Sequence, residues 1–141
     1  MTFLLDTNAI SEPGRVQPNP GFADWFEEVE DTAIFVSVVT FGELRHGVSM
    51  LAEGARRRHL EGLHLAIMRR YGSQILPVDL VVALAWGELA ARHRSSGRRP
   101  SVTDELIAAT ALVHDLIVVT RNVVDFEASG CRIVCPWSGD G

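Results

Sequence analysis

The sequence contains no lysine, and all 13 of its basic residues are arginine. A P-loop nucleotide hydrolase is therefore excluded, because its G-x-x-x-x-G-K motif requires a lysine. The G-x-S-x-G and H-E-x-x-H motifs of serine hydrolases and zinc proteases are also missing. The only two cysteines, Cys131 and Cys135, have no second pair beside them, so we expect no zinc site. We expect both thiols to be reduced and structural.

Long hydrophobic runs are absent as well. The longest, AIFVSVV and LVVALAW, fall far short of the ~20 apolar residues that a membrane-spanning helix needs. The N-terminal apolar stretch is short and follows no basic segment, unlike a secretory signal peptide. We therefore expect a cytoplasmic protein with no membrane span.

The balance of charge is acidic. A net charge of −5 argues against a protein that binds nucleic acid through its overall charge alone. The arginines nevertheless cluster at 56–59, 69–70 and 92–99. Such clusters can hold phosphate groups, because the guanidinium fork matches phosphate oxygens, or they can be solvated surface. The length of 141 residues and the hydrophobic content of 47% predict one globular domain over residues 1–141.

Segments with the spacing of strands and of helices alternate along the chain. The expected strands are 2–5, 33–39, 74–78, 116–120 and 132–135, and the expected helices are 18–30, 40–51, 53–71, 79–94 and 102–115. This alternation predicts an α/β fold with a mostly parallel central sheet. The arginine-rich segment 94–101 is expected to be a loop, and the final residues 137–141 to be frayed.

Polar residues follow the ends of three expected strands and open the apolar helix 102–115. They are Asp6, Thr7 and Asn8 after the first strand, Thr40 and Glu43 after the second, Thr120, Arg121, Asn122 and Asp125 after the fourth, and Asp104 in the helix. In open parallel sheets, ligands bind beyond the carboxyl ends of the strands. Three or four acidic residues from distant parts of the chain are therefore expected at one edge of the sheet.

Each of these acidic residues also has a purely structural interpretation. Asp6 is suited to cap the helix that follows it, and Asp104 completes a Ser-x-x-acid capping pattern with Ser101. Glu43, beside an apolar helical stripe, is typical of a solvated residue, and Asp125 is suited to cap a turn. Taken together, these interpretations do not explain why acids follow strand ends and open a buried helix.

Carboxylates gathered in this way repel one another. Two of them ~5 Å apart, at an effective dielectric constant of ~20, repel by about 3 kcal/mol. Three such pairs approach the whole stability of a domain, ~5–15 kcal/mol. The cluster is therefore expected to be protonated or to bind a cation, and ligands limited to hard oxygens favour Mg²⁺ or Mn²⁺.

Four sequence blocks, in this order, resemble the PIN-domain ribonucleases, and among them the VapC-type toxins of toxin–antitoxin pairs. The blocks are FLLDTNAIS, SVVTFGELRHG, VTDELIAATA and VVTRNVVDF, and the resemblance extends from Leu4 to about Val134. It implies a three-layer α/β/α fold and a metal-dependent endoribonuclease site. The first three acids of the family match Asp6, Glu43 and Asp104.

The fourth acidic position departs from the family pattern. Many members have an aspartate where this chain has Asn122. Asp125 can substitute as the fourth catalytic acid, or Asn122 can bind through its amide oxygen. The missing aspartate affects the expectation of a second metal ion more than the expectation of nuclease activity.

The resemblance implies hydrolysis of RNA phosphodiester bonds at a Mg²⁺ or Mn²⁺ site formed by Asp6, Glu43 and Asp104. Candidate contacts to the substrate or to the metal ligands are Thr7, Asn8, Thr120, Arg121, Asn122, Arg98 and Arg99. Also implied are an RNA substrate such as tRNA or rRNA, a homodimer, and a cognate VapB-like antitoxin that inserts into the active-site groove and blocks it.

Two other functions are compatible with parts of the sequence. A non-catalytic binding protein of PIN fold would act only through a partner. It should gain no thermal stability from Mn²⁺, whereas a vacant acid cluster should. A phosphatase with Asp6 as nucleophile, as in the haloacid dehalogenase superfamily, needs a second aspartate where Asn8 stands, and usually a lysine.

Overall fold

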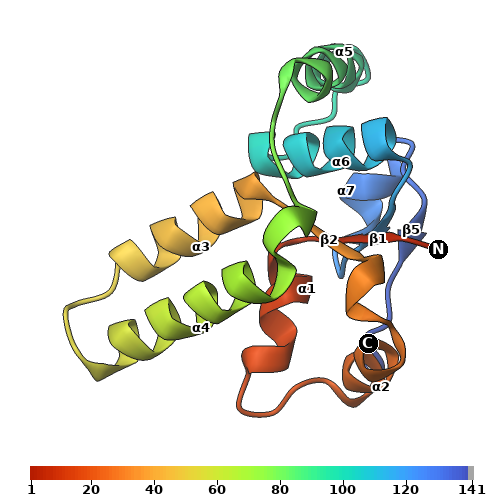
Figure 1. The fold of residues 1–141 in the computed structure, drawn as a ribbon. Helices are drawn as coiled ribbons and strands as arrows, with labels where there is room; N and C mark the ends of the chain where they lie inside the picture. The colour runs from red at the N-terminus through yellow and green to blue at the C-terminus, as the bar shows by residue number, and fades with distance from the viewer. Residues whose placement is uncertain (140–141) are drawn as a thin grey trace.

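The computed structural model describes residues 1–139 and contains a five-stranded central sheet (Figure 1). The strands are β1 (Phe3–Leu5), β2 (Ile34–Ser37), β3 (Ile75–Leu76), β4 (Ile117–Val119) and β5 (Ile133–Val134). Their order in the sheet is β3-β2-β1-β4-β5, and every neighbouring pair is parallel. The expected α/β fold is confirmed, and the sheet is parallel throughout rather than mostly so.

Helices cover both faces of this sheet. They are α1 (Thr7–Ser11), α2 (Pro20–Glu28), α3 (Val38–Ser49), α4 (Ala55–Tyr71), α5 (Leu80–Ser95), α6 (Val102–His114) and α7 (Val123–Glu127). α1, α2 and α4 pack on one face, α6 and α7 pack on the other, and α5 lies outside α6 (Figure 1). No helix within residues 1–139 is long and apolar enough to cross a membrane.

The central strand β1 contributes to two separate cores. Leu5 packs on one face of the sheet in a cluster with Phe22 and Tyr71, and Leu4 packs on the other with Ile107 and Phe126. Each fully buried leucine side chain contributes about 1.5–3 kcal/mol to folding. Because both faces are covered, the strand shows a continuous apolar run instead of polar alternation.

The register of the strands positions the residues that follow them. Leu5 of β1 lies beside Val36 of β2 and Val119 of β4. The chain therefore leaves these three strands at the same edge of the sheet, where Asp6 and Thr120 stand next to each other. α3 begins at this edge and runs beside α4 as a hairpin (Figure 1).

Several local features differ from the expectations. The strand expected over 33–39 ends at Ser37, because the Ser37 hydroxyl accepts the Val39 N–H over 3.1 Å and caps α3. This cap outweighs the preference of the β-branched Val38 and Val39 for a strand. Neither α1 nor α7 is among the expected helix ranges, because five residues are too few to show a helical period.

The chain segment after β5 is tied to the loop that precedes α2. Trp137 Nε1 donates to the Glu12 carboxylate over 2.9 Å, and the Ser138 N–H donates to the Asn19 side chain over 3.0 Å. The expected fraying of 137–141 is therefore wrong for Trp137 and Ser138. Residues 140 and 141 lie outside the described residues.

Candidate functional site

Asp6 stands at the end of β1 and is almost fully buried, with 5% of its surface exposed. Its Oδ1 accepts the Ala9 N–H over 2.9 Å, which caps α1, and its Oδ2 accepts the Thr120 hydroxyl over 2.6 Å. The Thr120 oxygen in turn accepts the Asn122 N–H over 2.9 Å. The capping interpretation of Asp6 is thus confirmed, and the same carboxylate also occupies the sheet edge.

Burial raises the pKa of Asp6 from its ordinary 3.8 to about 6. Hydrogen bonds from Thr120 and Ala9 oppose this rise, because they stabilise the ionised form. The charges of Asp104 and Glu43 add to it. The carboxylate is therefore ionised at neutral pH at an electrostatic cost that a bound cation would relieve.

Glu43 lies on α3, half-buried between threonines of two other helices. Its Oε1 accepts the hydroxyl of Thr7 from α1, and its Oε2 accepts the hydroxyl of Thr103 from α6 over 3.0 Å. The Thr7 hydroxyl also lies 3.5 Å from that of Thr40, which is fully buried. Both carboxylate oxygens are thus held at the sheet edge, and Glu43 is not a freely solvated residue.

Asp104 lies in the first turn of α6. Its N–H donates to the Ser101 hydroxyl over 3.1 Å, so the expected capping pattern at the start of α6 is present. Burial raises the pKa of Asp104, and the charges of Glu43 and Asp125 raise it further. Hydrogen bonds from Ser101 and Asn122 act in the opposite direction. Asp104 therefore shares one electrostatic environment with the other acids.

Asn122 sits between two carboxylates. Its side-chain nitrogen donates to Asp125 over 2.7 Å and to Asp104 over 3.4 Å. The amide thus turns its N–H groups, and not its oxygen, toward the acids. Asn122 and Asp125 therefore both lie near Asp104 at this edge of the sheet.

The other residues singled out from the sequence lie around this edge or in the adjoining loops. Asn8 is exposed on the first turn of α1. Arg121 follows β4, and its guanidinium carbon lies 5.9 Å from the ring centre of Trp137. Arg98 and Arg99 are exposed in the loop between α5 and α6, where Arg99 donates to the Arg98 carbonyl over 2.8 Å.

The sequence gives no indication of the contact made by Thr103. Its hydroxyl reaches Glu43 across 60 positions of the chain. A threonine in the first turn of a helix is common, and no periodicity marks it as a partner of a carboxylate. The only available signal is its place beside Asp104.

The oxygen atoms at this edge are suitable ligands for a hard divalent cation. Asp6, Glu43 and Asp104 supply carboxylate oxygens and Thr7 and Thr120 supply hydroxyls, which suit Mg²⁺ or Mn²⁺. Within residues 1–139, no three acidic, histidine or cysteine side chains lie close enough to enclose a metal ion by themselves. Mg²⁺ commonly binds through one or two carboxylates and keeps several waters. Converging but spaced carboxylates are compatible with that mode of binding.

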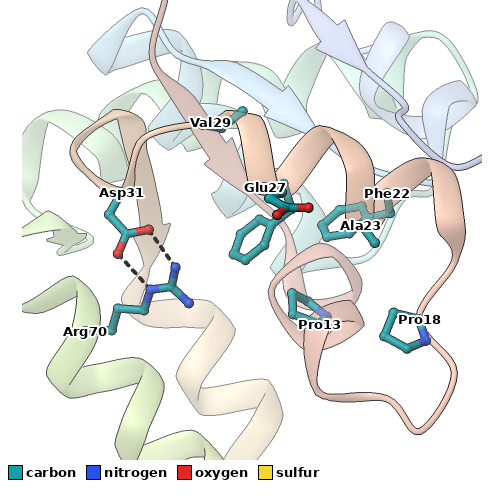
Figure 2. Close-up of a pocket in the computed structure, with 9 residues that line it drawn as sticks. Pro13, Pro18, Phe22, Ala23, Glu27, Val29, Asp31 and Arg70 are labelled. Atoms are coloured by element: carbon teal, nitrogen blue, oxygen red, sulfur yellow. Dashed lines mark hydrogen bonds and ion pairs between the residues drawn. The ribbon is translucent and has the colours of Figure 1, made fainter.

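A groove runs along the side of the molecule formed by α1, α2 and α4. Its smaller hollow, of about 430 Å³, is lined by Pro13, Pro18, Phe22, Ala23, Phe26, Glu27, Val29, Asp31 and Arg70 (Figure 2). Figure 2 shows Arg70 and Asp31 joined by two hydrogen bonds, of 2.8 and 2.7 Å, at one end of this hollow. A larger hollow of about 850 Å³ lies between α1 and α4 and shares Pro13, Phe26 and Arg70 with the first. The two hollows therefore adjoin along these three residues, and we refer to them together as the groove.

The larger hollow combines apolar and basic side chains. The apolar ones include Ile10, Leu60, Leu63, Ile67 and Tyr71, and the basic ones are Arg15, Arg56, His59, His64 and Arg70. Arg70 is paired with Asp31 and Arg15 with Glu12, so Arg56 is the basic side chain of this hollow best placed to meet an acidic partner.

The fold and the acidic edge together define a class of protein. A parallel α/β sheet whose carboxyl edge gathers acids from several separate segments is suited to chemistry that uses a divalent cation. The sequence model of the PIN domain matches residues 3–127. This chain therefore belongs to the PIN domain family, as the resemblance indicates.

Similar proteins cover nearly the whole chain. Toxin FitB from Neisseria gonorrhoeae (strain ATCC 700825 / FA 1090) is 36% identical over 135 residues, which cover 95% of this chain and 97% of that protein. VapC ribonuclease Y4jK from Sinorhizobium fredii (strain NBRC 101917 / NGR234) is 33% identical over 138 residues, covering 95% and 96%. The crystal structure of FitAcB from Neisseria gonorrhoeae matches with a TM-score of 0.89 at 35% identity, covering 98% of this chain and 100% of that chain.

Proposed function

We propose that this protein is a metal-dependent endoribonuclease that acts as the toxin of a toxin–antitoxin pair. The observation that carries the proposal is the meeting of Asp6, Glu43, Asp104 and Asp125 at one sheet edge, where burial and then the neighbouring carboxylates raise the pKa values of Asp6 and Asp104. Relatives named as a toxin and as a ribonuclease, similar over 95% of the chain, support both the reaction and the biological role.

Three of these carboxylates are proposed to hold the metal. Asp6, Glu43 and Asp104 would bind Mg²⁺ or Mn²⁺, which activates water and screens the charge of the attacked phosphate when it is bound. Thr120 and Thr103 each donate a hydrogen bond to one of these acids and so fix the direction of Asp6 and Glu43. These hydrogen bonds limit the movement of the carboxylates, and the waters that Mg²⁺ keeps can span the distance that remains between them.

We propose that Asp125 completes the acidic site and that two nearby arginines contact the RNA. The Asn122 amide holds Asp125 beside Asp104, so Asp125 serves as the fourth acid. Arg98 and Arg99, exposed in the loop that precedes α6, are suited to bind the RNA backbone through their guanidinium groups. We propose tRNA or rRNA in the cytoplasm as the substrate.

A phosphatase with Asp6 as nucleophile is disfavoured by the surroundings of this residue. Both of its carboxylate oxygens accept hydrogen bonds, and the side chain is almost fully buried. A nucleophilic carboxylate needs one oxygen free to reach the substrate. The role of a metal ligand, which tolerates a hydrogen-bonded carboxylate, agrees better with this geometry.

We further propose that the cognate antitoxin docks in the groove between α1 and α4. The apolar part of the groove includes Ile10, on the helix that directly follows Asp6. A bound segment can therefore continue from the groove to the acidic edge and block it. Arg56, beside this apolar lining, favours a segment that pairs apolar residues with acidic ones.

Substitutions in the groove test this docking. Leu63→Arg should weaken binding of the cognate antitoxin at least about tenfold, because it places a charge among apolar contacts, while RNA cleavage is unchanged. Leu65→Arg is the matched control, because Leu65 is exposed on the same helix and does not line the groove. Calorimetry with the purified antitoxin measures both affinities, and equal affinities would overturn the proposed surface.

The homodimer is proposed to form through the outer face of α5. Leu80, Val81 and Leu84 are 74%, 59% and 63% exposed on this helix, which is a large apolar area to leave in water. Leu84→Glu should convert the dimer to a monomer in light scattering coupled to gel filtration. A monomeric wild type, or a dimer unaffected by this change, would contradict the proposal.

Cleavage of RNA tests the proposed reaction. Antitoxin-free protein is incubated with a mixed pool of tRNA and rRNA, with Mg²⁺, with Mn²⁺ and with neither, beside the Asp104→Asn variant. We expect metal-dependent cutting by the wild type and none by the variant. A folded wild type that cuts nothing and gains no thermal stability from Mn²⁺ would favour the non-catalytic binding protein instead.

A further inference from the structure

A second polar cluster lies between α5, α6 and the turn after α7, and the proposed reaction does not use it. His93 of α5, Glu105 of α6 and Ser129 after α7 have only 3%, 7% and 3% of their surfaces exposed. His93 Nδ1 lies 2.7 Å from Glu105 Oε2, and His93 Nε2 lies 3.3 Å from Ser129 Oγ. The imidazole ring therefore joins α5, α6 and the turn after α7.

The composition of this cluster matches a Ser–His–Glu catalytic triad, but its surroundings do not. All three side chains are buried, and neither hollow of the groove is lined by any of them. A nucleophilic serine must be reached by its substrate. Ser129 is not accessible in this way, so the cluster has a role other than covalent catalysis.

Stability alone does not account for the cluster either. Burying ionisable groups between helices is often no better for stability than apolar packing. The same helix already supplies buried apolar residues, Val82 and Leu89. Hydrogen bonds differ from apolar contacts because they require one relative orientation of the groups. What the cluster adds is therefore a fixed register between α5, α6 and α7.

That register bears directly on the acidic site. Glu105 is the neighbour of Asp104, and successive residues of an α-helix point about 100° apart around its axis. Holding Glu105 against α5 therefore fixes the direction in which Asp104 points. Ser129 Oγ also lies 3.3 Å from the backbone carbonyl oxygen of Asp125, which extends the same network to α7.

The backbone of His93 anchors the arginine-rich loop as well. Its carbonyl oxygen accepts the Arg98 N–H over 2.8 Å and the Ser96 hydroxyl over 3.1 Å. His93 thus contacts Glu105, which is next to Asp104, and Ser129, which bonds to Asp125. It also contacts the loop that carries Arg98 and Arg99.

We propose that His93 is a positioning residue for the acidic site: through Glu105 and Ser129 it holds Asp104 and Asp125 in the orientation that metal binding and cleavage require. The inference rests on the proposed function for its effect on RNA cleavage. Its effect on metal binding and on local structure can be measured without RNA.

The test compares three variants at temperatures where all are folded. His93→Leu removes both hydrogen bonds, and we expect kcat and Mn²⁺ affinity to fall by about 10–100-fold, as for other residues that orient metal ligands. KM for RNA should change far less. His93→Asn keeps a side-chain N–H near the Nδ1 position and should restore much of the loss. Leu89→Ala is the matched control, because it removes buried apolar contact from the same helix and leaves the network intact.

Amide hydrogen exchange provides the readout that is independent of activity. In metal-free His93→Leu, exchange should accelerate over 101–106 and 122–127 and stay unchanged in β1. Loss of kcat and Mn²⁺ affinity in Leu89→Ala as large as in His93→Leu would overturn the inference, as would unchanged exchange and Mn²⁺ affinity in His93→Leu. A wild type that binds Mn²⁺ and shows the exchange effect but cuts no RNA would support the positioning and overturn the proposed function.

Discussion

The Thr120 hydroxyl donates to a carboxylate oxygen of Asp6 over 2.6 Å, which joins two residues 114 positions apart in the chain. They meet because β1 and β4, which end just before them, are neighbouring parallel strands. The hydroxyl stabilises the ionised carboxylate, while burial acts against it and raises the pKa of Asp6 to about 6. Asp6 is therefore charged at neutral pH in a position that favours a cation.

Asp6→Asn is expected to stabilise the metal-free protein at about pH 7, on the order of 2 kcal/mol. The pKa of Asp6 is raised in the folded state, so the folded protein holds more protons than the unfolded chain between about pH 4 and 6. Stability therefore falls as the pH rises through this window, and a neutral amide avoids the loss. Urea unfolding at about pH 7 and about pH 4.5 measures the difference in the free energy of unfolding between Asp6→Asn and the wild type. This difference should be smaller at the lower pH. A variant less stable than the wild type at neutral pH would contradict the expectation.

The affinity for Mn²⁺ should rise with pH between about 5 and 7 and then level off. Binding must displace protons from Asp6 and from Asp104, whose pKa values are both raised. Calorimetry in buffers of different ionisation enthalpy measures the protons released, and their number should be larger in acid than in neutral solution. Binding without proton release at any pH would exclude these carboxylates as the ligands.

Thr103→Val should lower kcat by about tenfold, because it removes the 3.0 Å hydrogen bond that orients Glu43 and leaves the side-chain shape unchanged. Thr110→Val is the control within the same helix. Thr110 is fully buried, but its hydroxyl donates to the Leu106 carbonyl of its own helix over 2.8 Å. Steady-state cleavage rates decide the comparison, and equal rates for the two variants would argue against a role of Thr103 at the site.

Asn122→Asp should destabilise the metal-free protein by about 1 kcal/mol, because it replaces a hydrogen-bond donor by a third charge between Asp104 and Asp125. Mn²⁺ should then raise the melting temperature of this variant by more than that of the wild type. Differential scanning calorimetry with and without Mn²⁺ checks both changes. If Mn²⁺ raises the melting temperature of both proteins by the same amount, residue 122 is too far from the metal to contact it.

The central strands could be predicted from the sequence because both of their faces are buried. Leu4 and Leu5 are fully buried on opposite sides of the sheet, so β1 appears as an uninterrupted apolar run. The end of β2 could not be placed, because the capping side chain of Ser37 outweighs the strand preference of the two valines that follow it. Local hydrogen bonds of this kind leave no trace in hydrophobic periodicity.

The acids of the site could be proposed from the sequence because each follows a strand or opens a helix, where parallel sheets gather their ligands. The residues that orient them could not. Thr103 reaches Glu43, and His93 reaches Glu105, only because of the angles at which α3, α5 and α6 pack. Those angles depend on side-chain packing across the whole layer and not on any local pattern.

We propose that one acidic site both binds the metal and cuts RNA. The most direct test titrates Mn²⁺ in one buffer and follows RNA cleavage and thermal stabilisation together, in the wild type and in Asp104→Asn. We predict that the two midpoints coincide in the wild type and that both responses are lost in the variant. Cleavage by Asp104→Asn at the wild-type rate, or a wild type that Mn²⁺ stabilises but that leaves RNA intact, would contradict the claim.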